Sequence, residues 1–581
     1  MRRACVRWVA RVAIAPGAVR RNLRCYGRHD RRGGEDGSHF AVSGPRPVGA
    51  HGGATGEDEQ RDDEQASHAP VVCIARTNQH RPVYCTDVRP HRIAGIWLPP
   101  EGAVVIATDE GLTSSSARAI AELVRRRKAS AEQVALAHLA RIEQLDGVFG
   151  AFQAVARELV LADARAVDAD PSRRNGPLAG VPVAVKDNVD VAGLPTRHGS
   201  AATPDRPAAA DDELVRRLRT AGCVVLGKTR MPELAIWPFT ESAAFGVTRN
   251  PWSPEHTAGG SSGGSAVAVA TRMAALALGS DGGGSLRIPA ACCGVFGFKP
   301  APGLVPLARE SESHWFGLSA VGPLSRTVED AALMLDILAG RPPRPEPGPP
   351  ARLRIVVSQR PNVPGSRIDP EVAAAVDDVA RRFREAGHAV TEADPPYPLD
   401  GATRFCRRWL PGIAEDAEGL DLARVEPRTR DMVRAGRLLR RLGLAAPVER
   451  EPLGSRLRAW FGDRELLVTP VLAWPPVRHH RWTSGWIRTT VGVARWIQTP
   501  VWNLTAFPAA SVPVALSKNN LPIAVQLVAP PGAEGTIFAA ARQVSDLVTF
   551  PAWAPVARQD RNPATSSSPP GSPPSSRRSA T

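Results

Sequence analysis

The sequence predicts an α/β fold: a large mixed, mostly parallel twisted sheet that helices cover on both faces. Two observations lead to this prediction. Short apolar runs alternate along the chain with longer segments of helical periodicity, which is typical of strands joined by crossover helices. Hydrophobic residues make up 43% of the chain but aromatic residues only 5%, so the buried core must consist mainly of Ala, Val and Leu.

The first predicted elements are helices. A segment over 113–128 places small and aliphatic residues on one helix face. Ser130 and Gln133 have the spacing of a capping box, which predicts a second helix through residue 145. A third helix is expected over 154–169. The predicted domain therefore begins with a helical segment before its first strand.

Strands and helices then alternate, with breaks at turn and proline-rich segments. Single elements are expected as strands at 181–185, 223–226, 275–278, 466–469, 509–514 and 523–528, and as helices at 211–221, 265–273, 327–338 and 534–547. A strand–helix–strand unit is expected over 352–390, and a mainly helical insertion over about 400–460.

The two ends of the chain differ from this pattern. Residues 1–103 are rich in Arg and Gly and lack sustained periodicity, so we expect a disordered extension that results from an over-extended gene start, with true initiation near Val104 or Val105. The Pro- and Ser-rich residues 558–581 are expected to be a disordered tail. The domain proper is then 104–557. Arg11 interrupts the only candidate leader and no apolar run reaches about 18 residues, which predicts a cytoplasmic protein without membrane association.

The net charge of +15 suggests a nucleic-acid binder, but its distribution argues against one. Nearly all the positive charge is Arg, much of it lies in the first hundred residues, and no helix-turn-helix, zinc-finger or RNA-binding pattern accompanies it. A non-catalytic scaffold or nucleic-acid binder stays as the alternative from another function class. We expect no nucleic-acid partner.

The stretch 259–300, GGSSGGSAVAVATRMAALALGSDGGGSLRIPAACCGVFGFKP, is the most informative part of the chain. It contains two glycine-rich turns that carry serine, separated by a buried apolar run. Glycine lets successive backbone N–H groups converge on one point, as an oxyanion hole requires. The N–H groups of Gly282, Gly283, Gly284 and Ser285 are candidates for such a hole, and Ser261, Ser262 and Ser285 for hydroxyl chemistry.

A base for such a hydroxyl is suggested by Lys186. It directly follows the apolar run 181–185, and the chain has only five lysines among 73 basic residues. A lysine can act as a base only where burial lowers its pKa, and a surface charge at a strand end is the alternative interpretation. The histidines are scattered and none lies in a GxSxG context, so a Ser-His-Asp enzyme is not favoured. Cys292 and Cys293 are expected to be buried packing residues, and no metal or cofactor motif is seen.

These motifs resemble the amidase signature family. GGSSGGS with SDGGGSLRIPAACCGVFGFKP carries the resemblance, and GVPVAVKDNVDVAG, GKTRMPELA, TESAAFGVTRNPW, NLTAFPAASVPVAL and LPIAVQLV extend it over roughly residues 110–557. Lys186 precedes Ser261 by 75 residues and Ser261 precedes Ser285 by 24, as in the family's Lys-Ser-Ser triad. The run WFGLSAVGPLSRTVEDAALMLD is most similar to the AmiB2-type amidases of mycobacteria and other actinobacteria.

The resemblance implies the amidase signature fold and a cofactor-free amidase that converts a carboxamide to carboxylate and ammonia. It implies Ser285 as acyl-forming nucleophile, Ser261 as bridging serine within a cis peptide, and Lys186 as the terminal base. Asp281 and Arg287 are expected to form a structural ion pair near the site, and Ser262 and Ser265 to donate hydrogen bonds in the loop and at the helix start. The expected partners are a small-molecule amide and water, with a homodimer as an open question.

Two departures from the family pattern concern the loops: Ala258 stands where Pro is common, and Ala506 where Gly is usual. An alternative within the family is the A-type subunit of glutamyl-tRNA(Gln) amidotransferase, which works with partner chains. The substrate is not defined by the sequence. Candidates for an acyl pocket, each equally explicable as core, are Trp237, Trp315, Trp486, Trp496 and Trp502.

Overall fold

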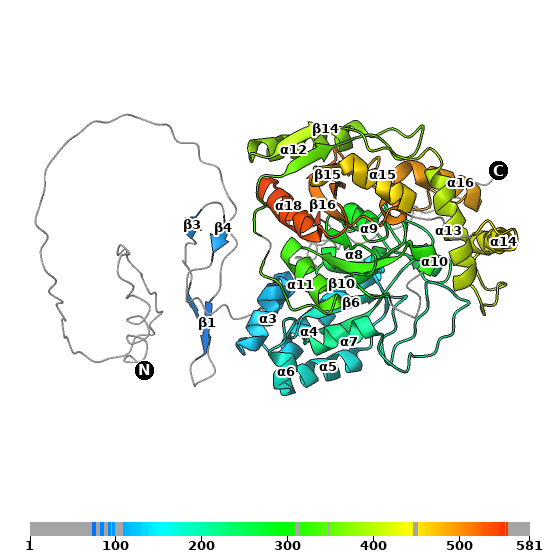
Figure 1. Ribbon diagram of the computed structural model, residues 1–581. Helices are drawn as coiled ribbons and strands as arrows, with labels where there is room; N and C mark the ends of the chain where they lie inside the picture. The colour runs from blue at the N-terminus through cyan, green and yellow to red at the C-terminus, as the bar shows by residue number, and fades with distance from the viewer. Residues whose placement is uncertain are drawn as a thin grey trace, which may run out of the picture. The chain divides into compact units, whose positions relative to one another are not determined.

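The structure is a computed structural model that divides into two compact units, Met1–Ile106 and Ala107–Thr581 (Figure 1). It describes residues 108–307, 314–346, 348–445, 451–551 and 554–555 and four earlier strands. In the first unit β1 (Cys73–Arg76) pairs with β2 (Pro82–Cys85), and β3 (His91–Ile93) with β4 (Ile96–Leu98), both antiparallel. Otherwise the segment 1–103 and the tail 558–581, for which we predicted disorder, lie outside the described residues.

The second unit is built on one 11-stranded sheet. Its strand order is β14-β13-β15-β17-β16-β11-β12-β10-β6-β7-β5. The strands span β5 Phe152–Ala154, β6 Pro182–Lys186, β7 Val224–Thr229, β10 Leu276–Asp281, β11 Phe296–Lys299, β12 Ala320–Ser325, β13 Arg354–Val357, β14 Ala389–Glu392, β15 Leu466–Pro470, β16 Ala509–Leu516 and β17 Pro522–Val528.

Parallel pairing in this sheet is concentrated in two blocks. β6 pairs parallel with β7 and β10, and β13 pairs parallel with β14 and β15. The strands between these blocks, and the edge strand β5, pair antiparallel. The predicted α/β fold with a large mixed sheet is confirmed, and the strands β6 and β10, which carry the motif residues, are neighbours in one parallel block.

Helices surround the sheet. They span α2 Asp109–Ser114, α3 Ala117–Arg125, α4 Ala131–Phe149, α5 Arg157–Ala169, α6 Pro171–Arg174, α7 Glu213–Thr220, α8 Gly263–Ala270, α9 Arg287–Cys293, α10 His314–Gly317, α11 Val328–Leu338, α12 Pro370–Glu385, α13 Gly401–Asp416, α14 Pro427–Arg441, α15 Glu451–Phe461, α16 Trp486–Trp496, α17 Pro500–Leu504 and α18 Glu534–Leu547. Figure 1 shows α4 to α7 at the opposite end of this unit from α12 and β14.

Two predicted helices agree closely with the structure. α4 begins with the capping box that Ser130 and Gln133 predict, in which each side chain accepts from the other residue's backbone N–H. α18 has the predicted bounds. The strands β5, β11 and β12 and the helices α9 and α16 were not predicted. α9 is buried on every side, so it lacks an apolar stripe, and α16 contains β-branched residues and a glycine that lower helix propensity.

The predicted helical insertion consists of α13, α14 and α15. Figure 1 shows α13, α14 and α16 gathered at one side of the unit, and α13 contacts α10, α14 and α17. Residues of α13 and α16 lie close to the second glycine turn, because they line one pocket together with Gly283 and Ser285. Among the described residues there is no helix with the length and apolarity that a membrane crossing requires.

Candidate active site

Lys186 is placed by the end of β6, a strand whose five residues are all buried. Val183, Ala184 and Val185 pair with β10, so the strand cannot shift without breaking the sheet. The lysine side chain is fully buried, and its Nζ donates hydrogen bonds to Ser261 Oγ at 2.7 Å and Ser280 Oγ at 2.9 Å. This geometry supports the interpretation of Lys186 as a base, because a surface lysine would lack these buried contacts.

Burial determines the protonation of Lys186. Removing the ammonium group from water disfavours its charged form, and the negative charge of Asp281 offsets only part of this effect. The resulting pKa of Lys186 is about 7, lowered from an ordinary value of 10.5. A substantial fraction of the side chain is thus a neutral amine at neutral pH, which is the form that can accept a proton.

The first glycine turn delivers Ser261 to this lysine. The peptide bond between Gly260 and Ser261 is cis, as the family resemblance implied. α8 begins two residues later, and the Ser262 hydroxyl donates to the carbonyl of Ser280 at 3.1 Å. The Ser265 hydroxyl lies 2.7 Å from Thr229 Oγ1. Ser262 and Ser265 are therefore held by hydrogen bonds to β10 and β7, in agreement with the loop roles that we predicted.

The second glycine turn, Gly282 to Ser285, wraps around the carboxylate of Asp281. This carboxylate accepts hydrogen bonds from the N–H groups of Gly284 at 2.6 Å and Leu286 at 3.2 Å. Arg287 donates to both of its oxygens, at 2.9 and 3.0 Å, and both side chains are fully buried. The predicted ion pair is present, and it shapes the turn that precedes Ser285.

The charge of Asp281 is stable across the physiological range. Burial alone would raise the pKa of this carboxyl group, but the Arg287 guanidinium and the Lys299 ammonium outweigh burial and lower the pKa to about 2. Asp281 is therefore an anion at every pH at which Lys186 titrates.

The hydrogen bond from Gly284 corrects the predicted oxyanion hole. Its N–H group points at Asp281 and so cannot also face a substrate oxygen. The N–H groups of Gly282, Gly283 and Ser285 have no hydrogen-bond partner within the described part of the chain. Gly284 instead has a conformational role, because its φ of 127° and the close approach of Thr499 leave no room for a Cβ atom.

Residues more than 200 positions away complete this turn, and the sequence did not reveal them. Asn503 donates to the Asp281 carboxylate and carbonyl at 2.9 and 3.0 Å. Thr499 Oγ1 donates to the carbonyl of Gly283 at 2.7 Å, and Gln526 Oε1 accepts from Arg287 at 2.7 Å. Asn503 lies in NLTAFPAAS, one of the segments that carry the family resemblance, and this was the available signal.

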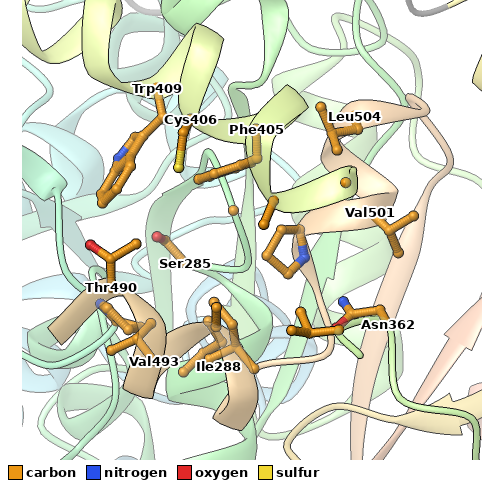
Figure 2. Close-up of a pocket in the computed structure, with 18 of the residues that line it drawn as sticks. Ser285, Ile288, Asn362, Phe405, Cys406, Trp409, Thr490, Val493, Val501 and Leu504 are labelled. Atoms are coloured by element: carbon orange, nitrogen blue, oxygen red, sulfur yellow. The ribbon is translucent and has the colours of Figure 1, made fainter. Parts of the chain in front are cut away.

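Ser285 opens into a pocket of about 110 Å³. The residue is 9% exposed, and Figure 2 shows its side chain with lining side chains on both sides. No hydrogen bond joins Ser261 Oγ to Ser285 Oγ within the described residues; the two turns meet instead where the Ser262 N–H donates to the Ser285 carbonyl at 3.3 Å. The site thus contains a buried lysine–serine pair next to a serine that a ligand can reach.

The pocket walls are apolar. α13 contributes Phe405, Cys406 and Trp409, and Val493 and Ile497 come from α16 and the residue after it (Figure 2). Further lining residues come from the loop that carries Ile236 and Trp237 and from α9 and α17. The aromatic rings contact one another. The ring centroids of Trp237 and Trp409 lie 6.0 Å apart in an edge-on arrangement, and those of Phe405 and Trp409 lie 5.7 Å apart.

Two of the five predicted pocket tryptophans line this cavity. Trp237 and Trp315 do so, and the Trp315 indole N–H donates to Asp416 at 2.7 Å, which fixes the ring beside the second glycine turn. Trp496 and Trp502 are fully buried core residues. Trp409 lines the pocket but was not singled out from the sequence, because helix α13 has no motif of its own.

The thiols take the structural role that we predicted. Cys292 and Cys293 are buried in α9, and burial raises the pKa of both thiols. Cys293 Sγ contacts the carbonyl of Ala258 at 3.4 Å, so it packs beneath the first glycine turn. Neither thiol is suited to act as a nucleophile.

Comparison with known proteins identifies the family of the chain. A family model described as amidase matches residues 133–538. The chain is 43% identical over 426 residues to a putative amidase AmiB2 of Mycobacterium tuberculosis, covering 70% of this chain and 90% of that protein. It is 32% identical to an acylamidase of Rhodococcus erythropolis, covering 73% of this chain and 93% of that one. The solved structure of 6-aminohexanoate cyclic dimer hydrolase superposes with a TM-score of 0.68 at 28% identity, covering 77% of this chain and 99% of the other.

Proposed function

The chain belongs to the amidase signature family, and on that premise we propose that it hydrolyses a carboxamide to carboxylate and ammonia through an acyl-enzyme on Ser285. The observation that carries the proposal is the fully buried Lys186, with a pKa of about 7 and 2.7 Å from Ser261, beside a serine at the floor of an apolar pocket. A hydroxyl becomes a useful nucleophile when a neighbouring base removes its proton. Lys186, acting through Ser261, supplies that base.

Acylation follows from these positions. The Ser285 oxygen attacks the amide carbonyl as its proton passes to Ser261, whose own proton passes to Lys186. The negative charge that develops on the carbonyl oxygen is stabilised by the N–H groups of Gly282, Gly283 and Ser285, each donor typically contributing about 3 kcal/mol. Lys186 then returns the proton through Ser261 to the departing nitrogen, which leaves as ammonia.

Deacylation uses the same relay, with water instead of Ser285 as the attacking group. Water loses a proton to the Ser261–Lys186 pair and adds to the ester carbonyl, and the Ser285 oxygen regains a proton as the carboxylate leaves. The relay requires the Ser285 hydroxyl to come within hydrogen-bond distance of Ser261 Oγ during the reaction. Catalytic hydrogen bonds often tighten in this way when substrate binds.

The pocket lining favours a substrate with a neutral acyl group over glutamine as the substrate. None of the described lining residues is charged, and the lining is apolar apart from Ser285, Asn362 and Thr490. Glutamine would bring an ammonium and a carboxylate into this site, and burying such charges without partners costs several kcal/mol. This argues against the glutamyl-tRNA amidotransferase alternative, and the serine–lysine geometry argues against a non-catalytic scaffold.

Hydroxylamine trapping tests the proposal. Purified protein is incubated with simple aliphatic and aromatic carboxamides and hydroxylamine, and hydroxamate formation is measured. We expect hydroxamate from the wild type and a loss of at least about 10³-fold in Ser285→Ala and Lys186→Ala. The matched control is Ser265→Ala, a buried serine of the same motif that does not line the pocket, which should retain activity.

The alternatives give different outcomes. Hydroxamate formation that survives in Ser285→Ala contradicts the assigned nucleophile. No turnover of any amide by a folded wild-type protein favours the scaffold, and glutamine-dependent activity that appears only with added partner chains favours the amidotransferase.

A further inference from the structure

The pocket contains a carboxamide whose hydrogen-bonding capacity is unused. Asn362 lies in the loop between β13 and α12, and its Oδ1 is buried without a hydrogen-bond partner in the described structure. The Trp237 indole N–H is likewise buried without a hydrogen-bond partner in the described structure, whereas the Thr490 hydroxyl donates to the carbonyl of Trp486 at 2.8 Å. Leaving a buried carbonyl oxygen unpaired costs about 1–3 kcal/mol, so we expect a ligand or a water molecule to pair with the Asn362 carboxamide.

Figure 2 shows Asn362 and Ser285 on different sides of the cavity, with Val493 and Ile288 near the serine and Val501 near the asparagine. The amide end of Asn362 is turned toward the other lining side chains. A ligand acylating Ser285 would therefore pass apolar walls before it reached this amide.

A chain of hydrogen bonds connects the backbone of Asn362 to the residues that support Ser285. The Asn362 backbone N–H donates to Gln498 Oε1 at 2.9 Å, and Gln526 Nε2 donates to the Gln498 carbonyl at 3.2 Å. Gln526 in turn accepts from Arg287, the residue that holds Asp281 and the turn before Ser285. One connected network thus supports the backbone at both ends of the cavity.

We propose that Asn362 is a distal subsite that binds a neutral hydrogen-bonding group, such as a hydroxyl or carboxamide, at the far end of the acyl chain. This inference rests on the proposed function. A carboxamide side chain offers one acceptor and two donors, so it pairs with either group. The preferred substrate is then an amide whose acyl chain is apolar near the scissile carbonyl and polar and uncharged at its end.

A matched substrate series tests the subsite. Terminal ω-hydroxy and ω-carbamoyl alkanamides are compared with plain alkanamides of equal non-hydrogen atom count, over chains of different length. At the length that spans the pocket we expect the wild type to favour the polar end by about three- to tenfold in kcat/KM, the range that one net hydrogen bond gives. Asn362→Leu, which is nearly isosteric, should abolish or invert that preference.

The control variant is Thr490→Val, because its hydroxyl is already paired and its loss should leave the ratio between the matched substrates unchanged. The same pairs are measured for binding to Ser285→Ala by calorimetry, where the ratio of affinities is read without turnover. A wild-type protein with no preference at any chain length, by turnover or by binding, overturns the inference, as does a preference that persists in Asn362→Leu. Absence of turnover together with a preference in binding contradicts the proposed function but not the subsite.

Discussion

The floor and the helical wall of the pocket are built in opposite ways. The floor, from Asp281 to Arg287, is built around a buried ion pair, accepts hydrogen bonds from Asn503 and Thr499, and donates one to Gln526. The wall, from α13 and α16, consists of apolar side chains in contact with one another. A turn that must aim N–H groups at one oxygen needs directional bonds, whereas a surface that excludes water needs only shape. Substitutions in the floor should therefore change rate, and substitutions in the wall should change substrate choice.

The largest expected effect is in the floor, at Arg287. Arg287→Met leaves the Asp281 carboxylate buried without its main counter-charge, which costs about 3–5 kcal/mol of folding free energy. The second glycine turn then loses its support, and we expect kcat to fall by about 10²-fold or more while KM changes little. Denaturant unfolding and steady-state kinetics measure the two effects.

A double variant separates the effect of an unpaired buried charge from the effect of a turn that has lost its support. Asp281→Asn combined with Arg287→Met removes both charges, so part of the lost stability should return because no unpaired charge stays buried. Recovery of stability without recovery of kcat is expected. If Arg287→Met alone keeps the wild-type kcat, the ion pair of Arg287 with Asp281 does not position the second glycine turn.

An intermediate effect is expected in the wall, at Phe405. Its ring lies against Gly283, and Phe405→Ala enlarges the cavity without removing a polar contact. We expect KM for short acyl amides to rise about tenfold, since each lost apolar contact group is worth roughly 1–3 kcal/mol, and bulky acyl amides to be favoured relative to short ones. Competition assays between short and bulky amides measure this change. A fall in kcat by the same factor for every amide would show that the wall also positions the chemistry.

The smallest effect is expected at Ala506, where this chain departs from the glycine usual in the family. Ala506 adopts a φ of 66°, a left-handed conformation that disfavours a Cβ atom. Ala506→Gly should raise the free energy of unfolding by up to about 1 kcal/mol with unchanged activity. Ala515→Gly, in the extended strand β16, is the control and should lower stability by about 0.5–1 kcal/mol. Equal losses in both variants would refute the strain at Ala506.

The sequence predicted the parts of the site that local pattern encodes. Lys186 follows an apolar strand, and Ser261 and Ser285 lie in glycine turns, so their residue types and positions were visible without coordinates. The ion pair of Asp281 with Arg287 was also within reach, since the two are close in sequence.

What the sequence could not supply depends on tertiary contact. Asn503 and Gln526 reach the Asp281 turn from more than 200 residues away, and no spacing rule connects them. The use of Gly284 as a donor to Asp281 rather than to a substrate depends on which way one N–H points. The pocket wall of α13 follows from packing of an insertion whose helical pattern predicts an apolar face but not the cavity it covers.

The pH dependence of kcat/KM for a neutral carboxamide tests the central claim most directly, which is that buried Lys186 is the base. Lys186 must be neutral to accept a proton, and its pKa is about 7. Activity should therefore be full above this pKa and fall about tenfold per pH unit below it, while Asp281, with a pKa of about 2, stays ionised throughout. An acid limb near pH 7 is the result that the structure predicts. A profile that is flat from pH 5.5 to pH 8 would contradict the role of Lys186.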